Sequence, residues 1–240
     1  MIARRFGGAA LVAGSLAFVT VFSFLAATFG YPDVLDESAA TVLPRLAAGG
    51  TPLRTAWLVY GAIPLTLLIG GLASMPLLER GGGRSLARVG GALAAVAALA
   101  MMVGLLRWPT LHWVLAERWQ AATADQREVY GAVFDGANAY LGNTFGEYLG
   151  ETMLAGWFIA MGIALRGFRR SSLGNGSVAA GVVALVAAQR QLTGIVEPVS
   201  DFNNLLLPVW LIVLGIVVWR DVKAPSSRSD MPWVSARSSA

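Results

Sequence analysis

The sequence predicts an all-α polytopic membrane protein with six transmembrane helices and short interfacial helices on its outer face. Hydrophobic residues make up 56% of the 240 residues and charged residues only 13%, whereas globular chains have about 45–50% and about 25% on similar counts. The mean hydropathy is +0.62, and a soluble fold of this size would leave about a third of its unfolded-chain area in water. The composition therefore excludes a soluble enzyme, a disordered regulator and a secreted disulfide scaffold.

Six mostly apolar stretches are each about 20 residues long, which is the length of one bilayer crossing. They cover residues 6–29, 53–78, 89–106, 145–165, 177–196 and 202–219. The first follows two arginines, as a signal peptide would, but its apolar core exceeds the roughly 7–15 residues of a signal, so we expect a retained helix. Residues 1–223 then form one transmembrane domain, and residues 224–240 form a disordered cytoplasmic tail rich in serine, arginine and proline.

The distribution of charge predicts the orientation of the six spans. One side receives both termini and the loops 79–88 and 166–176, and it holds 12 of the 18 basic residues but 3 of the 14 acidic residues. Because basic residues concentrate on the cytoplasmic side of membrane proteins, both termini are expected to be cytoplasmic. We interpret these arginines as determinants of topology rather than as a nucleic-acid-binding surface.

The two outer connections are predicted to carry structure of their own. Residues 31–50 contain apolar residues near helical spacing, which favours a short interfacial helix that Pro44 would limit or kink. The longest connection, residues 107–144, begins with a tryptophan cluster that includes Trp108 and Trp119. We interpret these tryptophans as an aromatic belt at the headgroup level, the alternative being an aromatic ligand box. A break near Gly142 would separate this connection from the fourth span.

Polar residues within the apolar spans mark the candidate site, because ionisable groups in a bilayer are costly and usually functional. Glu147 and Glu151 lie four residues apart and therefore on one helix face. Glycines at the same interval give an adjacent face on which another helix can pack closely, so the glutamates should face protein. Gln189, Arg190 and Gln191 interrupt the fifth span.

Depth along the helices predicts how these charges pair. Glu151 and Arg190 each lie about 9 Å below the predicted outer ends of their spans, at about 1.5 Å per residue. We therefore expect an ion pair between them, and a second pair between Arg107 and Glu147. The predicted pocket opens outward between the third, fourth and fifth spans. Its candidate ligand-binding residues are Arg107, His112, Asn143, Glu147, Glu151, Gln189, Arg190 and Gln191.

The sequence offers little for cofactor or catalytic chemistry. It has no cysteine and one histidine, so thiolate and multi-histidine metal sites are excluded, and a divalent cation on carboxylates would compete with the arginines. Phosphate-binding loops and the Gly-x-Ser-x-Gly elbow are absent. We predict no metal, no cofactor and no catalytic residue, and the question of enzyme activity stays open with the balance against it.

Three functions are consistent with these features. The first is binding or transport of a small solute at the outward-facing polar pocket. The second is a structural or regulatory role through helix–helix contacts with a membrane-protein partner. The third, with the least support, is a membrane-embedded hydrolase that uses a glutamate as general acid and base. The expected partners are the lipid bilayer and either a small-molecule ligand or a membrane protein, and nucleic acid is not expected.

Two groups of short motifs carry a family resemblance. The first is Phe29-Gly30-Tyr31-Pro32-Asp33-Val34-Leu35, followed by Val42-Leu43-Pro44-Arg45 and Gly49-Gly50. The second is Leu105-Leu106-Arg107-Trp108-Pro109, at the end of the third span. These motifs resemble an uncharacterised bacterial family of small six-span membrane proteins known only as a domain of unknown function. The resemblance implies six spans in the bacterial cytoplasmic membrane and brings no activity, substrate or catalytic residue.

Overall fold

The computed structural model describes residues 2–220, and every regular element within that range is a helix. The α-helices are α1 (Ile2–Phe29), α2 (Ala39–Ala48), α3 (Gly50–Ala62), α4 (Pro64–Leu106), α5 (Trp113–Trp119), α6 (Ala124–Ala137), α7 (Gly150–Gly167), α8 (Ser171–Ala187) and α9 (Glu197–Trp219). Three 3₁₀ turns, Asp33–Asp36, Ala188–Gln191 and Gly194–Val196, and two π-helical segments, Trp108–His112 and Asn138–Leu149, connect them. The predicted tail, residues 224–240, lies outside the described residues.

Between residues 2 and 220, five helical stretches are long and apolar enough to cross a membrane. They are Ile2–Phe29, Gly50–Trp119, Ala124–Gly167, Ser171–Gln191 and Gly194–Trp219. The chain is thus an all-α membrane protein, although this count differs from the six spans predicted. The difference arises in Gly50–Trp119, which contains both the second and the third predicted span.

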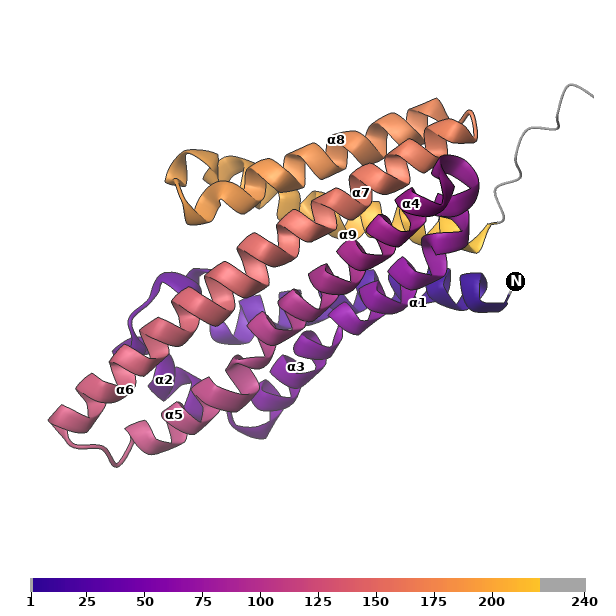
Figure 1. Cartoon of the computed structure of the whole chain (residues 1–240). Coiled ribbons are helices and arrows are strands. Elements are labelled where there is room, and N and C mark those ends of the chain that lie inside the picture. Colours follow the sequence, from indigo (N-terminus) through magenta and orange to yellow (C-terminus); the bar gives the residue numbers. More distant parts are fainter. Residues whose placement is uncertain (1, 221–240) are drawn as a thin grey trace, which may run out of the picture.

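Helix α4 is a hairpin rather than a straight rod. Gly83 has a φ of +89°, which glycine adopts without steric cost, and the helix reverses direction there (Figure 1). Close contacts join the two arms: a Cβ on Gly71 would lie 2.3 Å from the Cβ of Ala94, and one on Gly91 would lie 2.8 Å from the sulfur of Met75. Glycines therefore serve both the turn and the close antiparallel packing of the two arms.

The helices of the structure have other ends than the predicted fourth and fifth spans. No break occurs at Gly142, because the chain stays helical from Ala124 to Gly167 through the π-helical segment. Gly142 instead allows close approach, since a Cβ there would lie 2.5 Å from the Arg107 guanidinium. The fifth span ends at Gln191, not at residue 196.

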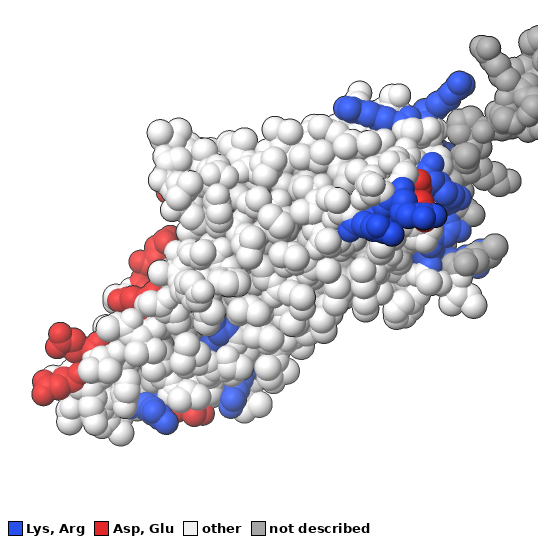
Figure 2. Space-filling view, viewed as in Figure 1, with Lys and Arg blue, Asp and Glu red and all other residues white. Residues whose placement is uncertain are grey.

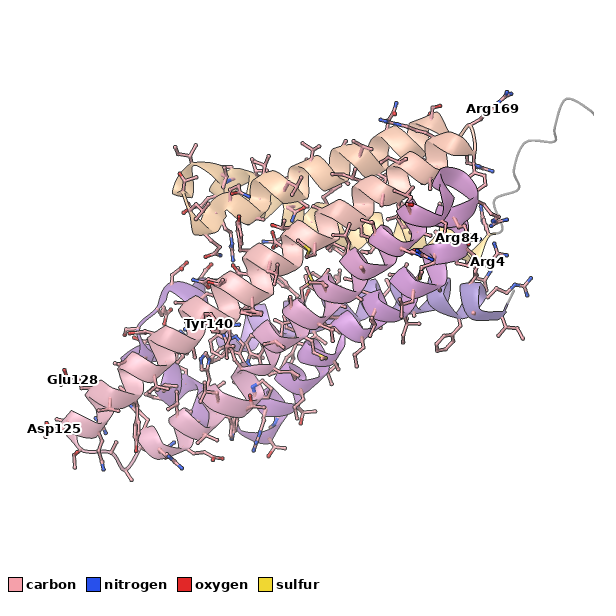
Figure 3. The ribbon with its side chains drawn as sticks, viewed as in Figure 1. Arg4, Arg84, Asp125, Glu128, Tyr140 and Arg169 are labelled. Carbon is pink, nitrogen blue, oxygen red and sulfur yellow. The ribbon has the colours of Figure 1, made fainter. Side chains whose placement is uncertain are left out.

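Charged residues separate between the two ends of the molecule. Most of the exposed arginines visible in Figure 2 gather at one end, and most of the acidic side chains gather at the opposite end. Figure 3 places Arg4, Arg84 and Arg169 at the first end, together with the α4 turn and the α7–α8 connection, and Asp125 and Glu128 at the second. We call these the basic end and the acidic end.

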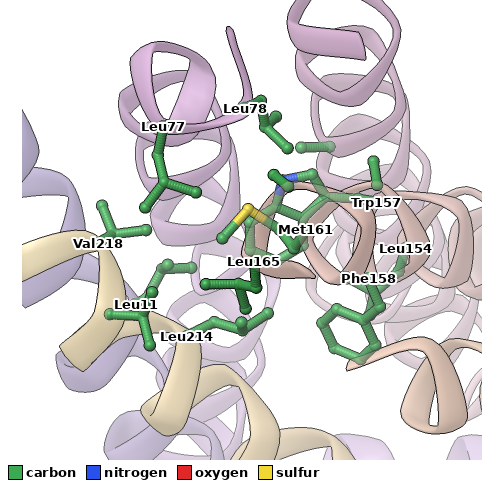
Figure 4. Packing of buried hydrophobic residues seen from close by; sticks show 14 of the residues in the cluster. Leu11, Leu77, Leu78, Leu154, Trp157, Phe158, Met161, Leu165, Leu214 and Val218 are labelled. Carbon is green, nitrogen blue, oxygen red and sulfur yellow. The ribbon is translucent and has the colours of Figure 1, made fainter. Parts of the chain in front are cut away.

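Two hydrophobic cores follow one another along the molecule. The first lies toward the basic end, where Leu11 of α1, Leu214 of α9 and Trp157 of α7 pack with the α4 hairpin (Figure 4). The second lies toward the acidic end and contains Trp57 and Trp108, whose rings stack with centroids 4.8 Å apart. Residues 31–49 and 108–137 close over this second core, and we call them the cap.

The cap differs from the interfacial helix and aromatic belt that were predicted. Val42, Leu43 and Leu46 of α2 are fully buried, and α2 packs against α5 and α6. Trp108 is also fully buried and Trp119 is 8% exposed, so these tryptophans are core residues rather than a membrane belt. The physical reason is that two apolar connections at the same end bury more surface against each other than against headgroups.

Candidate functional site

A partly enclosed cavity of about 160 Å³ lies where the two cores meet. Its wall is mostly apolar and is built by α1, α3, α4, α7 and α9, by residues 31–35, by the two π-helical segments and by one residue from the turn that follows α8. Four charged side chains line it: Arg107, Glu147, Glu151 and Arg190. The sequence placed this pocket among the third, fourth and fifth spans and missed the first and last helices, because packing between distant segments leaves no local signal.

Arg190 pairs with Glu147 and not, as predicted, with Glu151. The Arg190 Nε donates a hydrogen bond to Glu147 Oε2 over 3.1 Å, and the Arg190 Nη2 and Gln191 Nε2 donate to the same oxygen. The prediction failed because the fifth span ends at Gln191, so Arg190 lies at the end of the span instead of six residues inside it. Arg190 therefore lies closer to the acidic end than predicted, where it contacts Glu147.

Glu151 has neither a hydrogen-bond nor an ion-pair partner among residues 2–220, and its Oε2 is fully buried. Its charged neighbours are the Glu147 carboxylate, which repels it, and the Arg190 guanidinium, which attracts it but is already bonded to Glu147. A buried carboxylate without a partner is costly. Glu151 is thus the charged group of the cavity wall that has no hydrogen-bond partner in the described chain.

Arg107 is held by neutral groups rather than by the predicted ion pair with Glu147. Its Nη1 donates to the Gly104 carbonyl over 2.5 Å, its Nε donates to Asn138 Oδ1 over 3.0 Å, and its guanidinium lies 5.3 Å from the Trp108 ring centroid. The side chain is almost completely buried. Attraction to Glu147 remains, but the main role of Arg107 is to fasten the end of α4 to the π-helical segment.

Four predicted site residues, His112, Asn143, Gln189 and Gln191, do not line the cavity. His112 is fully buried in the cap, with ring centroids 4.8 Å from Trp108 and 4.5 Å from Phe134, and neither ring nitrogen has a hydrogen-bond partner in the described chain. Gln189 donates to the Leu185 carbonyl of its own helix over 3.1 Å. Asn143 is partly buried beside the cavity lining. Gln191 reaches the site through Glu147.

The glycine row of the fourth span faces protein, as predicted. A Cβ on Gly146 would lie 3.0 Å from the Cα of Gly104, and one on Gly150 would lie 2.8 Å from Met101. These contacts bring α7 and the π-helical segment against α4. The glutamates that flank the row are thereby held at the inner surface of the bundle, which explains why they reach the cavity.

An aromatic wall of the cavity was not recognised from the sequence. It consists of Phe18, Phe22, Tyr31 and Tyr60. Phe18 stacks with Tyr60 at 5.5 Å, and Tyr31 meets Phe22 edge-on at 5.3 Å. Burial raises the pKa of Tyr31 to about 12, and the nearby Glu147 carboxylate adds to the increase. The spacing of Phe18 and Phe22 at i and i+4 was the one available signal, and it is common to any apolar helix face.

No curated protein and no solved structure matches the chain. Residues 7–220 match a family described as a domain of unknown function, DUF4386. The match spans the helical bundle and the cap, and it includes both groups of motifs on which the resemblance was based. The chain therefore belongs to this family, the domain of unknown function DUF4386.

Proposed function

We propose that the chain crosses a bacterial cytoplasmic membrane six times, with its basic end in the cytoplasm. The two arms of α4, residues 64–82 and 84–106, are each about as long as one crossing requires. Their antiparallel contacts support two crossings within Gly50–Trp119. The concentration of arginines at the end with the α4 turn and the α7–α8 connection supports a cytoplasmic position for that end.

Within this topology, the protein binds a small solute in the central cavity. The observation that carries this proposal is the unpartnered Glu151 carboxylate at the cavity wall. A chain that needed only a stable bundle would gain by placing an apolar residue there, because an unpaired buried charge destabilises the fold. The volume of about 160 Å³ is similar to cavities that admit molecules of the size of benzene.

A partner-binding role has one observation in its favour and one against it. The Arg190–Glu147–Gln191 contacts form a closed group, as a purely structural ion pair would. However, the small-residue rows that would dock a partner helix are used within the chain. Gly146 packs on α4, and Gly176 packs against Trp210 of α9. Solute binding therefore accounts for more of the structure, and a hydrolase would still need a nucleophile beside Glu151.

Cysteine accessibility tests whether solutes reach the cavity. The chain has no cysteine, so single-cysteine variants have no background labelling. Ser15→Cys places a thiol on the cavity wall, whereas Ser74→Cys places one at a buried site outside it. The two serines are matched, because both are almost completely buried and both donate to a carbonyl of their own helix.

We expect a small methanethiosulfonate reagent to modify Ser15→Cys in the folded, detergent-purified protein and to leave Ser74→Cys unmodified. After unfolding, both variants should react equally. If neither thiol reacts in the folded protein, the cavity is closed to solutes and the proposal fails. If both react, local opening rather than the cavity gives access, and the proposal again fails.

A further inference from the structure

One of the four charged side chains that line the cavity lacks a hydrogen-bond partner. Glu147 accepts hydrogen bonds from Arg190 and Gln191, so its charge is compensated. Arg107 donates to a carbonyl and to an amide oxygen. Among the four charged side chains only Glu151 has no hydrogen-bond partner in the described chain, so the charged residue that a ligand can complete is an acceptor. An acceptor of this kind selects a ligand with a donor group, and most strongly a positively charged one.

The aromatic wall and the Glu151 carboxylate line the same cavity. Tyr31 and Glu147 line the same cavity, and Glu151 follows Glu147 by one helical turn, or about 6 Å along the axis. Aromatic faces stack with flat apolar groups and also attract cations. The cavity thus offers a carboxylate and an aromatic surface that face one enclosed volume.

From this arrangement we propose that the ligand is a small organic amine. Its protonated nitrogen donates to Glu151, and its apolar or aromatic body lies against Phe18, Phe22, Tyr31 and Tyr60. This proposal rests on the proposed solute binding and adds the chemical class of the solute. A cavity volume of about 160 Å³ suits a small molecule. The guanidinium groups of Arg107 and Arg190 already donate to acceptors of the protein, which leaves fewer free donors for an anion.

Three matched probes test the charge of the ligand. They are 2-phenylethylamine, 2-phenylethanol and 3-phenylpropionate, which share one aromatic body and differ in the group at the end of the linker. Binding to the purified full chain is followed by calorimetric titration and by the shift in melting temperature. We expect the dissociation constant of the amine to be lower than that of the alcohol by about tenfold, which corresponds to one charged hydrogen bond.

Two variants and one control locate the binding. Glu151→Gln keeps the size of the side chain and removes its charge, so it should abolish the preference for the amine over the alcohol. Phe22→Leu should weaken both probes together, because it reduces the aromatic wall. Glu128→Gln changes an exposed carboxylate of α6, far from the cavity, and should leave the preference unchanged, which separates specific binding from partition of the amine into detergent.

The outcomes distinguish this proposal from solute binding as such. Equal or tighter binding of the alcohol or the acid would overturn the amine assignment and leave solute binding intact. If none of the three probes binds although Ser15→Cys is accessible, the amine assignment is likewise overturned and solute binding is left intact. If no probe binds and Ser15→Cys is also inaccessible, both proposals fail. An amine preference that persists in Glu151→Gln would overturn the role of Glu151.

Discussion

Arg190, in the turn after α8, donates its Nε to Glu147 Oε2 over 3.1 Å, and Gln191 donates to the same oxygen. The two charged side chains are 28% and 20% exposed. The pair joins the turn after α8 to the π-helical segment before α7, and α7 and α8 themselves pack against each other. The pair lies at the cavity wall, where Glu147 is neutralised by Arg190 and the neighbouring Glu151 is left without a partner.

The first prediction concerns the energy of this pair. Glu147→Gln and Arg190→Gln should each lower the melting temperature, because each leaves a charge without its partner in a low-dielectric setting. The double variant should recover part of the loss, with a coupling of about 0.6–2 kcal/mol, the range for polar contacts between membrane helices. The measurement is a double-mutant cycle by thermal unfolding. A cycle on Glu151 and Arg190 is the control and should give a smaller coupling; equal couplings would contradict the assigned pairing.

The second prediction separates Glu151 from Glu147. Glu151→Gln should leave the melting temperature unchanged or raise it, because the amide removes an unpartnered buried charge at constant size. Glu147→Gln should lower the melting temperature, since the Glu147 carboxylate accepts three hydrogen bonds. The comparison needs only thermal unfolding of the two variants in the same detergent. A clear loss of stability in Glu151→Gln would show that the carboxylate has a structural partner.

Arg190 was predicted to pair with Glu151 and pairs with Glu147 instead. This difference shows what the sequence could and could not predict at this site. The helical spacing of Glu147 and Glu151 and the interrupted fifth span pointed to three of the charged residues that line the cavity, Glu147, Glu151 and Arg190. The pairing depended on where the fifth span ends, and no Gly–Pro signal marks its end at Gln191. Five residues of error in one boundary amount to more than one helical turn, which is enough to replace one glutamate by the other as partner.

For the fold as well, features that depend on neighbouring residues could be predicted from the sequence, and features that depend on contacts between distant segments could not. Apolar length predicted the helices, and loop arginines predicted the separation of charge between the two ends. The burial of Trp108 and Val42 in the cap could not be predicted, because a tryptophan beside a span has the same local pattern in a membrane belt and in a protein core. Only the contact between two connections far apart in the sequence distinguishes these cases.

The third prediction tests close packing between α4 and the π-helical segment. Gly104→Ala should destabilise the protein by about 1–3 kcal/mol, because its Cβ would lie 2.6 Å from the Cα of Gly146, where backbone has to move. Gly136→Ala is the matched control, since nothing lies within 4 Å of its Cβ. That variant should gain up to about 1 kcal/mol from helix propensity. Thermal unfolding checks both, and equal effects would contradict the packing.

The fourth prediction tests the proposed topology. Arg84→Cys at the α4 turn and Asp125→Cys at the start of α6 lie at the basic and the acidic end (Figure 3). In intact cells, an impermeant maleimide should label Asp125→Cys, whereas Arg84→Cys should require permeabilised membranes. Ser74→Cys is buried and should stay unlabelled in both conditions. Labelling of Arg84→Cys in intact cells would reverse the orientation, and labelling of both residues from outside would exclude six crossings.

The fifth prediction separates His112 from the ligand site. His112→Phe should raise the melting temperature or leave it unchanged, because both ring nitrogens are buried without partners, and each unsatisfied group costs about 1–3 kcal/mol. The phenyl ring keeps the contacts with Trp108 and Phe134. Trp108→Leu is the control for a true core residue, since it removes a fully buried indole, and it should destabilise strongly. Binding of 2-phenylethylamine to His112→Phe should equal that to the unmodified chain, because His112 does not line the cavity. A loss of binding without a loss of stability would instead return His112 to the site, through its contact with Trp108 at the cavity wall.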